Sequence, residues 1–195
     1  MAVYFVTSNK NKFFEAREIL GFEIKQVKPE IPEIQSMDVK RVVEDKARKA
    51  FERIGKPVIV EDTALYIKSW NSFPGPLITW VIKTMGIEGI CKFIGKDRSA
   101  KAEACVCYFD GKRVKTFSGI VKGKISKKPK GARRFDWDMI FIPDGEKRTF
   151  AEMEIEEKNK ISHRMKAFRK LKRHLTFANS DAASDHARAG RRTLY

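Results

Sequence analysis

Residues 3–15 read VYFVTSNKNKFFE, a short apolar run that gives way to small polar residues and then to lysines. The aromatic and β-branched residues of the run predict a strand covered on both faces. Thr7 and Ser8 supply hydroxyls, and Asn9 is a suitable N-cap for a helix, so backbone N–H groups and the positive end of the helix dipole would point out of the turn. With Lys10 and Lys12 close by, the turn predicts a site for an anion, and for a phosphate in particular. The alternative is an ordinary capped helix with solvated lysines.

Strands and helices alternate on either side of this turn. Helical spacing of apolar residues covers 10–20 and stops at Gly21, and a second helix begins after Asp38 and stops at Gly55. Residues 22–27 and 57–60 have the composition of strands, and the second of these runs into Glu61 and Asp62. This order predicts an α/β sheet.

The second half of the chain has a different character. It contains a loop over 67–76, helical periodicity over 80–94, a hairpin of strands 102–109 and 114–125, a short strand over 139–142 and a helical region over about 151–175. We therefore expect a two-lobed α/β domain over residues 1–175, with a long mixed sheet, flanking helices and a cleft between the lobes. Residues 176–195 lack a repeating apolar face, and we expect a disordered tail or an artificial extension there.

The composition narrows the classes of function and of partner. A chain of 195 residues with 42% hydrophobic and 34% charged residues is a folded globular protein. The net charge of +16 points to an anionic partner, which could be a nucleic acid, a nucleotide or an acidic membrane, although part of this charge also fits adaptation to heat. The three cysteines form no disulfide or zinc pattern, and the N-terminus has no leader, so we expect a cytoplasmic protein with no membrane partner.

Carboxylates lie where they could meet the phosphate site. Asp62 and Glu61 follow the strand over 57–60, and Glu33 lies in a rigid Pro-x-x-Pro segment. Carboxylates that face a lysine-rich phosphate site suggest a divalent ion that bridges protein and phosphate. Each acid could instead form a surface ion pair or cap a helix.

Two further groups could recognise a base. Phe135 and Trp137 alternate with Asp136 and Asp138, and such rings can stack on a nucleobase or simply fill a core.

The other group is the run Ser162-His163-Arg164, with Lys158 four residues before it. His163 could act as a general acid or base, or be a surface residue. The chain has neither a G-x-S-x-G elbow nor a P-loop.

Six short motifs occur in order between residue 3 and about residue 173. They are Thr7-Ser8-Asn9-x-x-Lys12-x-x-Glu15, Pro32-Glu33-x-Gln35, Glu61-Asp62-Thr63-x-Leu65 followed by Phe73-Pro74-Gly75-Pro76 and Trp80, Phe135-x-Trp137-Asp138, Phe150-Ala151-Glu152-Met153, and Glu157-Lys158-Asn159-x-x-Ser162-His163-Arg164-x-x-Ala167. Together they resemble the inosine triphosphate pyrophosphatase family, the Ham1-like pyrophosphatases of noncanonical purine nucleoside triphosphates.

The resemblance implies hydrolysis of ITP, dITP or XTP to the monophosphate and pyrophosphate, with Mg2+ or Mn2+, by a homodimer with a two-lobed α/β fold. It implies that Glu33 and Asp62 hold the metal, and that Asp62, Glu33 and Lys12 are catalytic. The residues it assigns to the substrate are Thr7, Ser8, Asn9, Lys12, Lys46, Thr63, Phe135, Trp137, Asp138, Lys158, Ser162, His163 and Arg164.

The chain departs from the family pattern at three positions. Asp136 stands where the family usually has glycine, Met139 where it has proline, and Ala64 where glycine is common. These departures bear on the preferred base and on the rate rather than on the reaction class.

Two alternatives remain: a Maf-type nucleotide pyrophosphatase, or a basic protein that binds nucleic acid or nucleotide without turnover. As partners we expect a nucleotide and a second copy of the chain, and we do not expect a nucleic acid.

Overall fold

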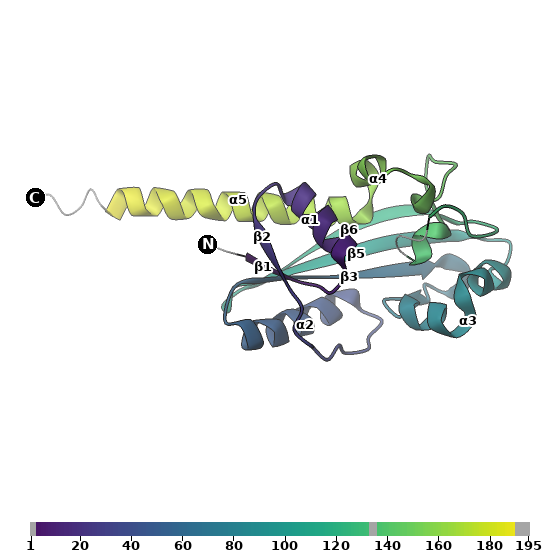
Figure 1. The fold of residues 1–195 in the computed structure, drawn as a ribbon, viewed down its shortest axis with the longest axis horizontal. Helices are drawn as coiled ribbons and strands as arrows, with labels where there is room; N and C mark the ends of the chain where they lie inside the picture. Colours follow the sequence, from purple (N-terminus) through teal and green to yellow (C-terminus); the bar gives the residue numbers. More distant parts are fainter. Residues whose placement is uncertain (1–2, 133–135, 190–195) are drawn as a thin grey trace, which may run out of the picture.

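The structure is a computed structural model that describes residues 3–132 and 136–189, and side chains within 3–132 and 137–176. Within this part of the chain, seven strands form one sheet in the order β2-β1-β3-β5-β6-β7, with β4 paired to β3 (Figure 1). The strands are β1 Val3–Val6, β2 Ile24–Val27, β3 Val58–Ile67, β4 Pro74–Gly75, β5 Ser99–Phe109, β6 Val114–Ile125 and β7 Phe141–Pro143. The helices are α1 Lys10–Leu20, α2 Val39–Ile54, α3 Ile78–Phe93, α4 Ile155–Ile161 and α5 His163–Ala189, with short 3-10 helices η1 Lys68–Trp70, η2 Asp136–Met139 and η3 Phe150–Glu152.

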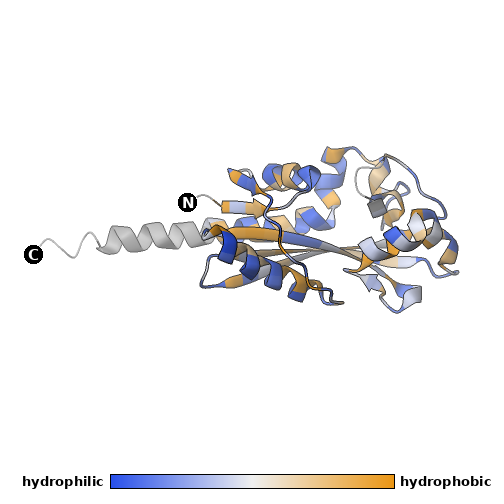
Figure 2. Ribbon diagram, turned by 60° about the horizontal axis from the view of Figure 1, so that its bottom comes forward, coloured by the Kyte–Doolittle hydropathy of each residue, from blue (hydrophilic) through white to orange (hydrophobic). Residues whose placement is uncertain are grey.

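The sheet is mixed, as the sequence predicted. β1 is parallel to β2 and β3, whereas the pairs β3–β5, β5–β6 and β6–β7 are antiparallel. In Figure 1, α1 and α5 lie on one side of the sheet and α2 lies on the other. Hydrophobic and hydrophilic residues alternate around α2 (Figure 2), because one stripe of the helix packs on the sheet and the rest faces water.

β3 is longer than the sequence predicted, and this corrects the placement of Glu61 and Asp62. The strand was expected to end at Val60, but it continues to Ile67 because β5 pairs with it along its whole length. β1, in contrast, pairs with β3 only as far as Ile59. Glu61 and Asp62 therefore lie inside a strand, beside the point where its parallel neighbour ends.

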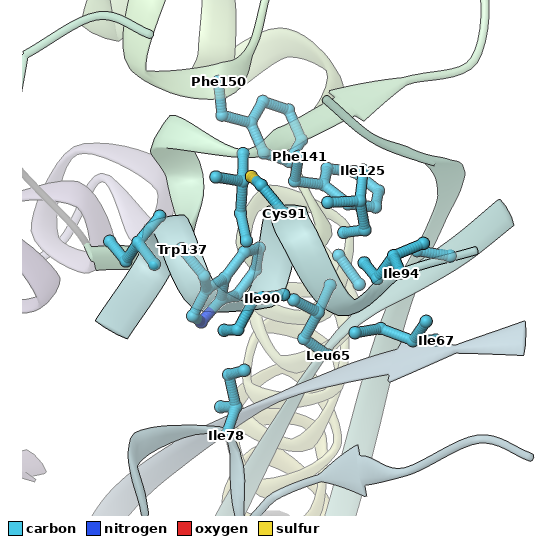
Figure 3. Close-up of a cluster of buried hydrophobic side chains, with 14 of the residues drawn as sticks. Leu65, Ile67, Ile78, Ile90, Cys91, Ile94, Ile125, Trp137, Phe141 and Phe150 are labelled. Carbon is cyan, nitrogen blue, oxygen red and sulfur yellow. The ribbon is translucent and has the colours of Figure 1, made fainter. Parts of the chain in front are cut away.

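Three groups of buried side chains hold the layers together. One joins α1 and α5 to the sheet through residues such as Ala16 and Phe168, and a second joins α2 through Val43 and Ala47. The third surrounds α3 and includes Ile90 (Figure 3). Complete burial of an aliphatic or aromatic side chain of this size contributes roughly 1.5–3 kcal/mol, so these clusters fix the helices to the sheet.

Gly119 in β6 lets the start of α5 approach the sheet. A Cβ atom at this position would lie 2.0 Å from the backbone oxygen of His163. Any side chain larger than hydrogen would push the first turn of α5 outward. This glycine thus sets the position of the segment Ser162–Arg164.

Two other expectations need correction. The strand expected over 139–142 is preceded by η2 and covers Phe141–Pro143 instead. α5 continues to Ala189, so a helix occupies most of the segment in which we expected a disordered tail. The segment is rich in alanine and has no glycine or proline before Gly190, which favours a helix. The domain boundary at residue 175 stays a prediction.

Among the described residues, no helix combines the length and apolar character needed to cross a membrane.

Candidate active site

The turn after β1 has the predicted helix cap. The side chain of Asn9 accepts the backbone N–H of Lys12 at 3.1 Å, and α1 begins at Lys10. The hydroxyl of Thr7 accepts the backbone N–H of Asn9 at 3.1 Å, which fixes the turn before the helix. Ser8 is exposed at its tip. The positive end of α1 therefore faces the space that opens beyond β1.

Glu61 and Asp62 point to opposite faces of the sheet, because side chains alternate along a strand. Glu61 lies on the same face as Ile59, which packs with α1 and α5. Asp62 lies on the face of Val60 and Ala64, which pack with α2. The two neighbouring acids thus belong to two different environments.

A buried network of charged side chains lies on the Glu61 face. Arg164 donates from Nε to Glu61 Oε1 at 3.0 Å and from Nη1 to Glu15 Oε2 at 2.5 Å. Lys12 Nζ lies 2.9 Å from Glu61 Oε2. α5 is in this way joined to α1 and β3.

Lys158 extends the network toward η2. Its Nζ lies 2.6 Å from Asp138 Oδ2 and 3.3 Å from Glu15 Oε1. The ammonium, like both of its carboxylate partners, is more than nine-tenths buried. We call the six residues Lys12, Glu15, Glu61, Asp138, Lys158 and Arg164 the buried charge network; it has three acids and three bases, so its formal charges cancel.

Two members of the network, Glu61 and Arg164, are held in their charged forms. Burial alone would raise the pKa of Glu61, but Arg164 and Lys12 outweigh it and lower the pKa to about 2. Burial opposes the charge of Arg164, and Glu61 and Glu15 overcome this and raise its pKa above the usual 12.5. Both groups therefore carry full charge at neutral pH.

An open cleft lies near the Asp62 face. Thr7, Ser8, Glu33 and Lys46 help to line a cavity of about 290 Å³. Glu33 also lines a second cavity of about 180 Å³, together with Asp62. Lys46 Nζ forms an ion pair with Glu33, which ties the loop over 28–36 to α2. The cleft thus combines a helix N-terminus, a lysine and two carboxylates.

The environment of Asp62 suits proton transfer. Burial raises its pKa above the ordinary 3.8, and Lys12 and Lys46 act in the opposite direction. A carboxylate with a raised pKa is a stronger base than a free one. Glu33 and Asp62 also supply the oxygen donors that a hard divalent ion prefers, and Mg2+ needs only one or two carboxylates when phosphates complete its shell. The residues of the cleft thus fit such an ion.

A third cavity, of about 490 Å³, lies on the other side, between α1 and α4. Phe14, Phe150 and Met153 contribute apolar walls, and Asp138 and Lys158 contribute polar ones. This cavity borders the buried charge network. An apolar hollow with a few fixed polar groups is the usual form of a site for a flat organic ligand.

The aromatic and Ser-His-Arg segments lie largely in the core. The rings of Trp137 and His163 are 5.1 Å apart, and Phe150 lies 5.8 Å from His163 on another side. Ser162 is a helix cap, whose hydroxyl accepts the backbone N–H of Met165 at 3.1 Å. Phe135, which we expected to stack on the base, lies outside the described residues. Thr63 lies in β3 and is half-buried.

His163 should make stability depend on pH. Burial, with Arg164 and Lys158 nearby, lowers its pKa well below the usual 6.5. The unfolded chain then binds a proton more readily than the folded chain. The contribution of His163 to the free energy of unfolding is therefore fully present above pH ~6.5. It decreases as the pH drops below that value, by at most about 1.4 kcal/mol per pH unit. Unfolding by guanidinium chloride between pH 5 and 8 should show this dependence of the free energy of unfolding on pH, and His163→Gln should reduce its slope. An identical slope in the variant would mean that folding does not shift the pKa of His163.

Sequence reasoning missed the roles of Glu15 and Glu61. The motif gives Glu15 no role, and the sequence predicts that Glu61 faces the phosphate site beside Asp62. Glu15 bridges Lys158 and Arg164, and Glu61 bridges Lys12 and Arg164. The signal that could have found Glu15 is its place on the buried stripe of α1, four residues before Ile19 and one before Ala16.

Comparison with known proteins identifies the family of the chain. The Ham1 family profile matches residues 3–174. The chain is 44% identical over 171 residues to a dITP/XTP pyrophosphatase of Saccharolobus solfataricus, covering 85% of this chain and 89% of the relative. It is 40% identical over 178 residues to an inosine triphosphate pyrophosphatase of Schizosaccharomyces pombe, covering 88% and 93%. The solved structure of a HAM1 protein from Coxiella burnetii superimposes with a TM-score of 0.77 at 28% identity and covers 90% of this chain and 98% of its own. The chain therefore belongs to the Ham1 family.

Proposed function

We propose that the protein hydrolyses noncanonical purine nucleoside triphosphates such as ITP, dITP and XTP to the monophosphate and pyrophosphate, and so removes damaged nucleotides from the pool. The observation that carries the proposal is that two neighbouring acids of β3 face different environments on the two sides of the sheet. Asp62 faces an open cleft lined by both lysines and carboxylates, while Glu61 faces a buried network that borders an apolar cavity. Relatives at 40–44% identity are named for this activity.

In this proposal the cleft residues act on the phosphates. The N-terminus of α1 with Thr7, Ser8 and Asn9 binds phosphate oxygens, and Lys12 and Lys46 neutralise their charge. Water attacks the phosphorus in line, its proton passes to Asp62, and the bond between the α and β phosphates breaks as pyrophosphate leaves. The raised pKa of Asp62 supports its assignment as the base.

We also propose that Mg2+, or Mn2+ in its place, binds at Glu33 and Asp62 and neutralises charge on the leaving pyrophosphate. Glu33 forms an ion pair with Lys46 in the structure. If Glu33 held the ion, Lys46 would lose this partner and its ammonium would be available to a phosphate oxygen.

Base selection is assigned to the cavity between α1 and α4 and to the segments beside it. Lys158 has only hydrogen-bond donors, so it favours a 6-oxo purine, whose O6 accepts, over adenine, whose amino group donates. Asp138 orients Lys158 through their 2.6 Å contact. Trp137, Ser162 and His163 support the polar side of the cavity that Asp138 and Lys158 form. Arg164 holds this side in place through its contact with Glu15.

Selectivity tests this assignment. We expect kcat/KM for ITP or XTP to exceed that for ATP by roughly 10²–10⁴, because a site built to donate to the base rejects a base that cannot accept. Lys158→Met should reduce the ratio at least tenfold, whereas Lys160→Met, at an exposed position on the same helix, should not change it. An unchanged ratio in a folded Lys158→Met protein would contradict the role of Lys158.

We also propose that the protein is a homodimer in the cytoplasm. Trp70, Phe73, Trp80 and Met85 line an apolar surface cavity of about 500 Å³. Trp80 is 54% exposed, and its indole N–H donates to Gln35 at 2.6 Å, beside the cleft. Since large exposed apolar patches mark interfaces, we assign this one to a second copy of the chain. The mass in solution, measured by light scattering, decides between one copy and two.

A further inference from the structure

A second charged surface lies far from the cleft. A cavity of about 620 Å³, which we call the basic groove, is lined by Arg98, Lys124, Ile125, Ser126, Lys127, Lys128, Lys130 and Ile142. Five of these eight residues are cations and none is acidic. The groove lies where β6 ends, at the end of the sheet away from the C-terminal part of α5 (Figure 1).

The frame of the groove is held by hydrogen bonds. Arg98 donates to the backbone oxygens of Cys91, Ile94, Ile125 and Ser126 at 3.1, 3.3, 2.8 and 2.5 Å. The Ser126 hydroxyl donates to the Lys128 oxygen at 2.6 Å. The backbone N–H of Lys130 donates to the Met139 oxygen at 2.9 Å. The guanidinium of Arg98 is thus used to hold the loop in place, and the loop presents its lysines on a fixed support.

The four lysines of the groove, Lys124, Lys127, Lys128 and Lys130, carry uncompensated charge. All four are exposed, and none is in an ion pair with a carboxylate in the described part of the chain. Other lysines of this protein are paired, as in Lys40 with Glu44 and Lys49 with Asp45. A balanced surface of the kind that stabilises proteins at high temperature would pair these lysines as well.

The groove is separate from the cleft. Lys124 lies opposite Ser99 on β5, and Asp62 lies opposite Cys105 on the same strand. Six residues of strand separate these two positions, or about 20 Å at ~3.3 Å per residue. A nucleotide in the cleft would not reach the groove.

We propose that the basic groove binds the phosphodiester backbone of a nucleic acid without reading its sequence. Exposed ammonium groups on long side chains suit successive phosphates of a polymer, each contact releasing counterions. Among the described residues, the lining has no aromatic ring on which a base could stack, so the contacts would be to the backbone. The sequence led us to expect no nucleic-acid partner, because the charge of +16 does not tell where the lysines gather.

Fluorescence anisotropy with a labelled 24-nucleotide DNA single strand of mixed sequence tests the proposal. The groove variant carries Lys124→Gln, Lys127→Gln, Lys128→Gln and Lys130→Gln. The matched control carries Lys25→Gln, Lys56→Gln, Lys112→Gln and Lys172→Gln, which are exposed and distant in the sequence, and which remove the same charge.

At about 50 mM salt the groove variant should bind at least tenfold more weakly than the wild type, and its slope of log K against log salt should be smaller by about 3, as for four lost phosphate contacts. The control variant should lose less than threefold in affinity. Hydrolysis of ITP should be the same in all three proteins, so failure of the groove proposal and failure of the proposed function remain distinguishable.

Three results would overturn the proposal. The first is a wild type that does not bind the strand. The second is an equal loss of affinity in the two variants, which would indicate a diffuse electrostatic field. The third is competition by tripolyphosphate and a 6-nucleotide strand that matches the 24-nucleotide strand at equal phosphate concentration, which would indicate a site for a small anion.

Discussion

Asp62→Asn is expected to lower kcat/KM for release of pyrophosphate from ITP by about 10²–10⁴, which is the usual effect of removing a general base. Asparagine has the same shape but cannot take the proton of the attacking water. Because Asp62 is half-buried and lines a cavity rather than the packed core, the variant should fold normally. A coupled assay for pyrophosphate measures the rate, and circular dichroism checks the fold.

Asp110→Asn is the matched control for this substitution. Asp110 accepts the backbone N–H groups of Lys112 and Arg113 in the hairpin turn, at 2.8 and 2.7 Å, and asparagine can do the same. This variant should keep the wild-type rate. Full activity in Asp62→Asn would move the role of base to another group and contradict the assignment of Asp62.

Arg164→Met is expected to cause the largest loss of stability. The guanidinium is 2% exposed and contacts Glu61 and Glu15, so its removal leaves two buried carboxylates without their main cation. Breaking a buried ion pair in this way typically costs about 3–5 kcal/mol. Unfolding by guanidinium chloride at pH 7, with the midpoint and the denaturant slope fitted together, measures the change in the free energy of unfolding.

Arg148→Met is the matched control, because it removes the same charge from an exposed ion pair instead of a buried one. Arg148 donates to both carboxylate oxygens of Glu157 at 3.1 Å, but both side chains are about half exposed. Its loss should leave the unfolding midpoint nearly unchanged, because water replaces the partner. Equal effects of the two substitutions would show that the buried charge network adds little to the fold.

The sequence predicted local structure well where the signals are local. The bounds of α1 and α2 follow from Asn9 and Asp38 as caps and from Gly21 and Gly55 as stops, and the structure confirms all four. The hairpin of β5 and β6 was equally visible from its turn at 110–111. Such features depend on neighbouring residues, which a sequence displays directly.

The sequence did not predict features that depend on distant partners. The length of β3 is set by its pairing with β5, which lies some forty residues away. The contact of Arg164 with Glu15 spans 149 positions, so no spacing rule could indicate it. The basic loop was visible as a run of lysines, but its groove also needs Arg98 and the end of β6.

Product analysis of ITP hydrolysis tests the central claim most directly. Purified protein is incubated with ITP and Mg2+, and the products are separated by ion-exchange chromatography. The account predicts IMP and pyrophosphate in equal amounts, with ATP converted far more slowly under the same conditions. IDP and inorganic phosphate as products, or no product at all, would contradict it.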